Sequence, residues 1–126
     1  LATMKNIVLE ISTSMRARGL KVIGCTVAPR TTSINDWATV EGQTPVSGFE
    51  VGGIRDQYNA WIVNYADGLI DHWCDPNELI ESPVAPGKWN VNGLPDFATT
   101  DGIHPTSYSH LLMAQVLNRL LKTLAA

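Results

Sequence analysis

The sequence predicts an α/β domain built around a parallel β-sheet. Three observations lead to this fold class. Residues 3–18 carry apolar side chains at spacings of three and four, which is typical of an amphipathic helix. Residues 20–28 form a nearly continuous apolar run rich in β-branched side chains, as in a strand covered on both faces. The order helix, strand, loop, helix, strand is that of a right-handed βαβ crossover.

The first helix and the strand that follows it have recognisable ends. Arg16 and Arg18 suit the C-terminal end of the helix dipole, and Gly19 suits a C-terminal cap. Pro29 ends the predicted strand. Residues 30–50 are rich in Thr, Ser, Gly and Pro, so an irregular loop is predicted there.

The middle of the chain predicts a second helix and a second strand. Residues 53–66 again carry apolar side chains at helical spacing. The pair Asp67-Gly68 breaks this helix. A short strand then begins at Leu69 and runs into Asp71.

The last third of the chain divides into a long loop and a terminal helix. Residues 72–102 contain four prolines and little periodicity, and loops beyond about 12–15 residues tend to be either functional or disordered. Residues 105–124 place a proline at the first helical position, followed by leucines at helical spacing. Because no repeat or linker interrupts the pattern, residues 1–126 predict one domain.

Composition and charge exclude several classes of protein. Of the 126 residues, 44% are hydrophobic and 17% are charged, which argues against a disordered chain, a collagen and a disulfide scaffold. The net charge is −3 and the basic residues are scattered, so no nucleic-acid partner is expected. No apolar run approaches the ~20 residues of a membrane helix.

The most informative chemical feature is the segment Asp101-Gly102-Ile103-His104-Pro105, where the long loop meets the last helix. A carboxylate three residues before a histidine on a tight turn can accept a hydrogen bond from the imidazole Nδ1–H. That bond fixes the tautomer and leaves Nε2 free to take a proton from a nucleophile. Pro105 restricts the backbone of His104 to extended conformations. The alternative is that Asp101 only caps the turn, with His104 hydrogen-bonded beside it.

This segment, with Tyr108 and Ala114 in the following helix, resembles the last conserved block of the SGNH, or GDSL, esterase and lipase family. The strand VIGCTVAPR, the helix RDQYNAW and the segment ADGLID resemble the middle of those proteins. The resemblance implies the C-terminal part of a flavodoxin-like SGNH-hydrolase three-layer sandwich with a parallel sheet. It covers nearly all of this chain but only the C-terminal half or so of the family's fold.

The resemblance implies a serine ester hydrolase in which His104 is the general base and acid and Asp101 orients it. The substrate would be a carboxylic ester, including acetyl and carbohydrate esters, hydrolysed through an acyl-enzyme without metal or cofactor. The family's Gly-Asp-Ser block, second-block glycine and Gly-x-Asn-Asp block do not occur here. No serine of this chain has the strand–turn–helix context that an exposed nucleophile needs.

The 126-residue chain by itself is therefore predicted to be inactive. Activity would require the missing N-terminal segment or a second chain that supplies the serine, glycine and asparagine blocks. Self-association is a further expectation, because the open edge of the strand at residues 20–28 invites another strand.

Two other kinds of site were weighed against this one. A non-catalytic module on the same scaffold would bind a ligand or partner through residues 72–102. A metal site would use Asp71, His72 and Asp75, with His104 as a further ligand. Their spacing matches no established zinc pattern, so no metal is expected.

The tryptophans, cysteines and one polar pair complete the candidate residues. Three tryptophans lie in predicted loops: Trp37, Trp73 and Trp89. Filling gaps between loops and helices is favoured for them over a sugar- or acyl-binding surface. Cys25 and Cys74 are expected to be free thiols, with Cys25 packed in the buried strand. Arg55 and Asp56 are expected to form a surface or loop-anchoring polar network.

Overall fold

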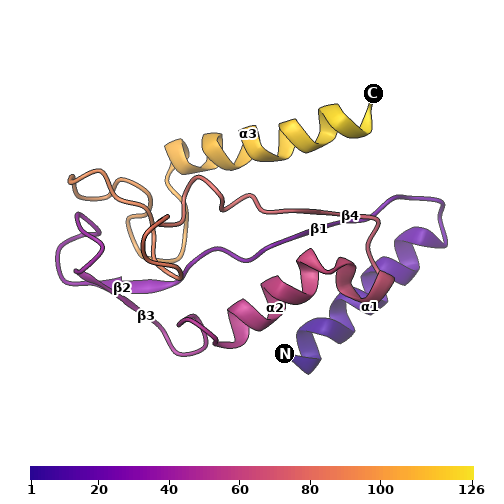
Figure 1. Ribbon diagram of the computed structural model, residues 1–126, viewed down its shortest axis with the longest axis horizontal. Coiled ribbons are helices and arrows are strands. Elements are labelled where there is room, and N and C mark those ends of the chain that lie inside the picture. Colours follow the sequence, from indigo (N-terminus) through magenta and orange to yellow (C-terminus); the bar gives the residue numbers. More distant parts are fainter.

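The computed structural model describes residues 1–126 and contains three α-helices, a short 3₁₀ segment and two small sheets (Figure 1). The helical elements are α1 (Ala2–Arg16), α2 (Ile54–Val63), η1 (Tyr65–Gly68) and α3 (Ser107–Leu124). The strands are β1 (Ile23–Cys25), β2 (Thr31–Ser33), β3 (Gln43–Pro45) and β4 (His72–Cys74). The mixed α/β class with a small parallel sheet and three helices is therefore confirmed. None of the helices is long and apolar enough to span a membrane.

The parallel sheet consists of β1 and β4, which lie between helices on both sides. Ile23 is registered with His72, and Cys25 with Cys74. Figure 1 shows α1 and α2 on one side of this strand pair and α3 on the other. The α2 side is filled by Trp61, Ile62, Ala66 and Ile70, against which Val8 of α1 and Val22 pack. A second cluster forms beneath the long loops from Ile80, Trp89 and Ala98.

The two parallel strands differ in extent from the prediction. The predicted strand at residues 20–28 shortens to Ile23–Cys25, and it is not covered on both faces, because Cys25 is exposed. The physical reason is that α3 packs mainly against β4, the partner strand, and not against β1. The predicted strand at residues 69–71 is also wrong. Asp71 precedes β4 instead of ending it, since Leu69 and Ile70 contribute to the apolar cluster before the strand begins.

The irregular loop predicted for residues 30–50 contains an antiparallel hairpin formed by β2 and β3. Its buried side chains are polar, with Thr31 and Gln43 almost fully enclosed. A hairpin of three-residue strands that buries polar side chains has no apolar alternation to reveal it in the sequence.

The second helix ends earlier than residue 66. Its last residue is Val63, and Tyr65, Ala66 and Asp67 have φ angles of 61°, 46° and 57°. This left-handed turn is held by Trp61, whose Nε1–H donates to Asp67 Oδ2 over 2.6 Å. Three successive non-glycine residues in this conformation cannot continue a right-handed helix.

The last helix begins two residues later than predicted. Thr106 is its N-cap and accepts a hydrogen bond from the Ser109 N–H through Oγ1, over 3.2 Å. Pro105 therefore lies before the cap instead of at the first helical position, and it pairs with Thr99 in an isolated antiparallel bridge.

Asp71 connects the N-terminal ends of the parallel strands to α1. Its Oδ2 accepts the Val22 N–H over 2.9 Å, and its Oδ1 lies 3.2 Å from both Arg16 NH2 and Lys21 Nζ. The backbone hydrogen bond from Val22, reinforced by Arg16 and Lys21, lowers the pKa of Asp71 to about 2.

Asp71→Asn is expected to reduce the acid sensitivity of the fold. The Asp71 carboxylate stabilises the folded state fully above its ordinary pKa of 3.8, and this contribution disappears as the pH falls through about 2. Urea unfolding near neutral pH and at about pH 2 measures the difference. The variant should lose less stability on acidification than wild type. Asp36→Asn, which removes an exposed carboxylate without hydrogen bonds, should behave like wild type. Equal acid sensitivity of all three proteins would contradict the prediction.

Candidate functional site

Asp101 and His104 meet at the turn that precedes α3. The Asp101 Oδ2 and His104 Nδ1 atoms are 2.7 Å apart. The other carboxylate oxygen, Oδ1, accepts the backbone N–H groups of Ile103 and His104, each over 2.8 Å. Since both carboxylate oxygens are bound, the imidazole is held in one orientation by a carboxylate that is itself fixed.

The same contacts keep the Asp101 carboxyl ionised. The hydrogen bond from the His104 imidazole, together with the backbone N–H groups, holds the pKa of Asp101 well below its usual range. An ionised Asp101 accepts the Nδ1–H, which leaves Nε2 as the free nitrogen. The His104 side chain is 78% exposed, and no hydrogen bond within the chain involves its Nε2. The arrangement can therefore accept a proton at Nε2 and stabilise the resulting imidazolium.

Thr99 holds the backbone of this turn, a role that the Asp101–His104 motif alone does not indicate. It is fully buried, and its Oγ1 donates to the His104 carbonyl over 2.8 Å. The same oxygen accepts the Gly102 N–H over 2.9 Å. A threonine two residues before Asp101 is a recognisable turn signal, but its partners depend on the closed turn.

Gly102 connects the turn to distant parts of the chain. Its φ is +76°, a left-handed conformation that favours glycine. Its carbonyl accepts the Trp89 Nε1–H and the Thr31 N–H, both over 3.1 Å. A Cβ at this position would lie 1.9 Å from the Thr31 carbonyl oxygen. The β2–β3 hairpin and Trp89 thus press directly against the Asp101–His104 turn.

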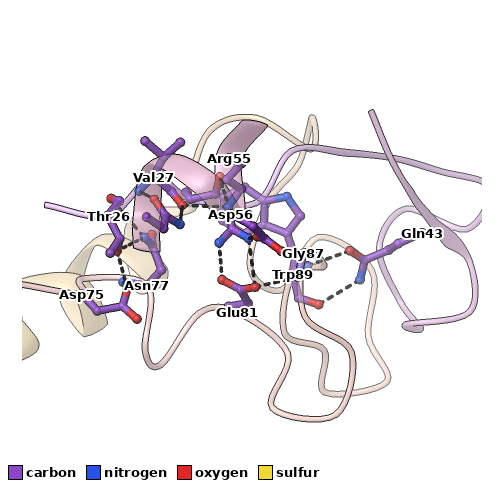
Figure 2. Close-up of polar contacts among 12 residues, drawn as sticks. Thr26, Val27, Gln43, Arg55, Asp56, Asp75, Asn77, Glu81, Gly87 and Trp89 are labelled. Atoms are coloured by element: carbon purple, nitrogen blue, oxygen red, sulfur yellow. Dashed lines mark hydrogen bonds and ion pairs between the residues drawn. The ribbon is translucent and has the colours of Figure 1, made fainter. Parts of the chain in front are cut away.

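Gln43 of the hairpin fixes Trp89 in turn. Its Oε1 accepts the Trp89 N–H over 2.9 Å, and its Nε2 donates to the Trp89 carbonyl over 3.0 Å (Figure 2). Both residues are buried, so this two-point contact holds the long loop against the hairpin.

Arg55 anchors the loops at the carboxyl end of β1. Its Nε donates to the carbonyls of Val27 and Ala28, and its guanidinium forms an ion pair with both oxygens of Glu81 (Figure 2). Glu81 also accepts the Gly87 N–H. Of the two alternatives expected for Arg55, a surface network or a loop-anchoring network, the structure shows the loop-anchoring one, because the side chain is only 3% exposed.

The residues weighed as metal ligands do not converge. Asp71 precedes β4 and Asp75 follows it, so the two carboxylates lie at opposite ends of that strand. Asp75 instead accepts a hydrogen bond from Thr26 Oγ1 at the end of β1. His104 is engaged by Asp101.

The tryptophans occupy three different environments. Trp89 is completely buried and fills the second core cluster, as expected of a gap-filling residue. Trp37 is half-buried, and its Nε1–H donates to Thr31 Oγ1 over 2.9 Å. Trp73 lies in β4 and is 38% exposed, so its predicted loop position is wrong.

The chain's hydroxyl and thiol groups do not complete a triad with His104. No hydrogen bond joins the His104 imidazole to a serine, threonine or cysteine side chain. Ser109 lies in the first turn of α3, but it is buried and its Oγ donates to the Ala98 carbonyl. A proton acceptor is therefore present without a nucleophile beside it.

An open cleft of about 480 Å³ lies between residues 92–97 and 106–108, and neither Asp101 nor His104 lines it. Thr106, which follows His104 by two residues, closes one side through its Oγ1–H donated to the Phe97 carbonyl. The Phe97 and Tyr108 rings line the cleft with centroids 5.5 Å apart. Their neighbours include Asn92 and Asp96, so the lining combines aromatic and polar groups.

Comparisons with protein-family models, curated proteins and solved structures found no match to this chain. The function of the chain is therefore inferred from the Asp101–His104 geometry and the resemblance of its motifs.

Proposed function

We propose that this chain is part of a serine ester hydrolase of the SGNH type, with His104 as general base and acid and Asp101 as its orienting carboxylate. The observation that carries the proposal is the 2.7 Å contact between Asp101 Oδ2 and His104 Nδ1. The contact supports the role because the carboxylate is immobilised through its other oxygen, while Nε2 stays accessible.

In the proposed reaction, His104 Nε2 takes the proton of a serine hydroxyl as that oxygen attacks the ester carbonyl. The imidazolium, stabilised by Asp101, then returns the proton to the departing alcohol. Water attacks the acyl-enzyme with the same base, which releases the acid and regenerates the serine. Oxyanion donors of the kind that the resemblance implies would bind the developing negative charge.

The serine and the oxyanion donors belong to a segment that would pair with this chain. It would be the N-terminal part of the same protein or a second chain. The outer edge of β1 supports such pairing, because β1 is hydrogen-bonded only to β4 and leaves backbone groups available on its other side. A second copy of this chain is the other candidate for that edge.

The cleft between residues 92–97 and 106–108, whose second segment begins two residues after His104, is the proposed binding place for one side of the ester. Its two aromatic rings offer apolar contact area, and Asn92 and Asp96 offer hydrogen-bonding groups. This combination is compatible with a small acyl group or a sugar ring, so acetyl and carbohydrate esters are the proposed substrates.

The first test is hydrolysis of p-nitrophenyl acetate together with labelling by a fluorophosphonate probe. The isolated chain is expected to be inert in both assays, because the nucleophile is missing. The chain joined to a segment with the Gly-Asp-Ser, glycine and Gly-x-Asn-Asp blocks is expected to hydrolyse the ester. A Gly-Asp-Ser block encoded directly before Leu1 would identify the natural segment.

In the joined protein, Asp101→Asn is expected to lower kcat by roughly 10⁴-fold, because the amide favours the wrong imidazole tautomer. His104→Ala should have an effect at least as large, and Asp36→Asn should leave kcat unchanged. NMR of the imidazole nitrogens gives an independent readout on the isolated chain, where Asp101→Asn should redistribute the proton between Nδ1 and Nε2.

Two results would overturn these expectations. Esterase activity of the pure isolated chain that disappears in His104→Ala would contradict the predicted inactivity. A joined protein that folds but neither labels nor hydrolyses esters would favour the alternative, a non-catalytic binding module that uses residues 72–102.

A further inference from the structure

The two cysteines face each other across the parallel sheet. Cys25 of β1 and Cys74 of β4 are registered partners. Neighbouring strands lie about 4.8 Å apart, which falls within the roughly 4.4–6.8 Å between α-carbons that a disulfide spans. Neither thiol is bonded to another in the structure.

Strand alternation directs both cysteine side chains toward the α3 side of the sheet, and Cys25, on the outer strand β1, also borders a cavity lined by Tyr58 and Ile62 of α2. A Cβ at Gly24 would meet Ile70 Cδ1 at 2.6 Å and Ile62 Cδ1 at 3.3 Å, so position 24 faces the α2 side. Because successive residues of a strand alternate between faces, Cys25 points to the opposite side. Its registered partner Cys74 points the same way.

The two thiols differ in solvent exposure because of the position of α3. The helix covers Cys74, which is 4% exposed and lies with Val116 and Arg119 in a shallow cavity. Its main contacts are with β4 and not with β1, and Cys25 is exposed. An external disulfide can therefore reach Cys25, whereas Cys74 is reached most directly from Cys25 itself.

We propose that Cys25 and Cys74 form an intrachain disulfide in an oxidising thiol–disulfide environment, with a small disulfide such as oxidised glutathione as the oxidant. The Cys25 thiolate attacks one glutathione sulfur, which breaks the glutathione S–S bond and releases one reduced glutathione. The Cys74 thiolate then attacks the Cys25 sulfur and releases the second. The two cysteines lose two electrons and two protons, and two glutathione thiols form.

β1 and β4 must move slightly closer together for this bond to form. The β-carbons of a disulfide are about 3.8 Å apart, less than the roughly 4.8 Å spacing of unmodified strands. β1 can accommodate this movement, because it has only three residues and no neighbour on its outer edge. The bond would fasten the strands beside Thr26 and Asp75, from which the loops of the candidate site depart.

The bond is expected to form slowly. Although Cys25 is exposed as a residue, partial desolvation of its sulfur raises the pKa of the thiol, and the Asp75 carboxylate raises it further. Burial likewise raises the pKa of Cys74, with smaller contributions from the charges of Cys25 and Asp75. The equilibrium state, reached after prolonged incubation, is therefore the appropriate readout.

In the experiment, the purified chain is equilibrated in buffers with defined ratios of reduced to oxidised glutathione. The reaction is then quenched with acid, the intact mass is measured, and free thiols are alkylated with iodoacetamide. The expected product is a monomer that has lost two hydrogens, that resists alkylation at both cysteines and that yields a Cys25–Cys74 linked peptide after proteolysis. Cys25→Ser and Cys74→Ala should each abolish the two-hydrogen loss. Cys74→Ala should instead accumulate a glutathione adduct on Cys25.

Two outcomes would overturn the proposal. One is wild-type chain that carries glutathione on Cys25 while Cys74 remains free to alkylate after denaturation. The other is a dimer joined through Cys25. Peptide mapping of the wild type decides the question even where a variant folds poorly. The mass measurement and the peptide mapping do not depend on esterase activity, so they test this proposal separately from the proposed function.

Discussion

Gly102→Ala is expected to destabilise the folded chain by about 3–5 kcal/mol, through backbone strain and overpacking together. The strain follows from the φ of +76°. The overpacking follows because the new Cβ would lie 1.9 Å from the Thr31 carbonyl oxygen and 2.8 Å from Trp37 Cζ2. The turn that carries Asp101 and His104 must shift to relieve this clash, so the imidazole tautomer should change as well.

Gly19→Ala is the matched control, because Gly19 has the same φ of +76° and a Cβ there would meet nothing within 4 Å. Gly19→Ala should lower the free energy of unfolding only through backbone strain, by about 1 kcal/mol. Urea unfolding of the two variants separates strain from steric overlap. Equal losses for the two substitutions would show that the contact with Thr31 is unimportant.

Arg55→Ala is expected to cost about 3–5 kcal/mol, because it leaves the partly buried Glu81 carboxylate without its cation. The carbonyls of Val27 and Ala28 lose a donor at the same time. Arg55→Lys should recover part of the loss, since it keeps the charge but cannot reproduce the two-pronged contact. The free energy of unfolding from urea titration measures both changes.

A second arginine–glutamate pair, which is exposed, serves as the control that tests whether burial strengthens the Arg55–Glu81 pair. Arg119 NH2 lies 2.9 Å from both oxygens of Glu78, but this arginine side chain is 61% exposed. Arg119→Ala is expected to change stability by only about 0–1 kcal/mol. If Arg55→Ala and Arg119→Ala cost the same, burial is not what makes the Arg55–Glu81 pair important.

Local sequence patterns predicted the helices well and the sheets less well. The positions of α1 and α3 follow from apolar side chains at helical spacing, which depend only on near neighbours. The predicted first and last residues of β1 and β4 were wrong, because the length of each strand depends on which helix covers it. The β2–β3 hairpin was missed, since Thr31 and Gln43 are buried for their hydrogen bonds instead of their hydrophobicity.

In the candidate site, too, local contacts could be predicted from the sequence and long-range contacts could not. The Asp101–His104 contact was predictable, because both residues lie on one turn. The supports of that turn were not, because Trp89 and Thr31 reach Gly102 from distant segments. Glu81 as the partner of Arg55 also lies far along the chain, and no short motif connects the two.

The pairing of β1 with β4 also determines the order in which the chain can fold. The two strands are about as far apart in sequence as Val22 and Asp71, which are separated by 49 positions. A helix can form in about 0.1–1 μs, whereas these strands can pair only after a long loop has closed. Early folding species are therefore expected to contain α1 and α3 while both edges of β1 are bare. At high protein concentration, such species meet one another before the sheet has closed, so refolding yield should fall as concentration rises.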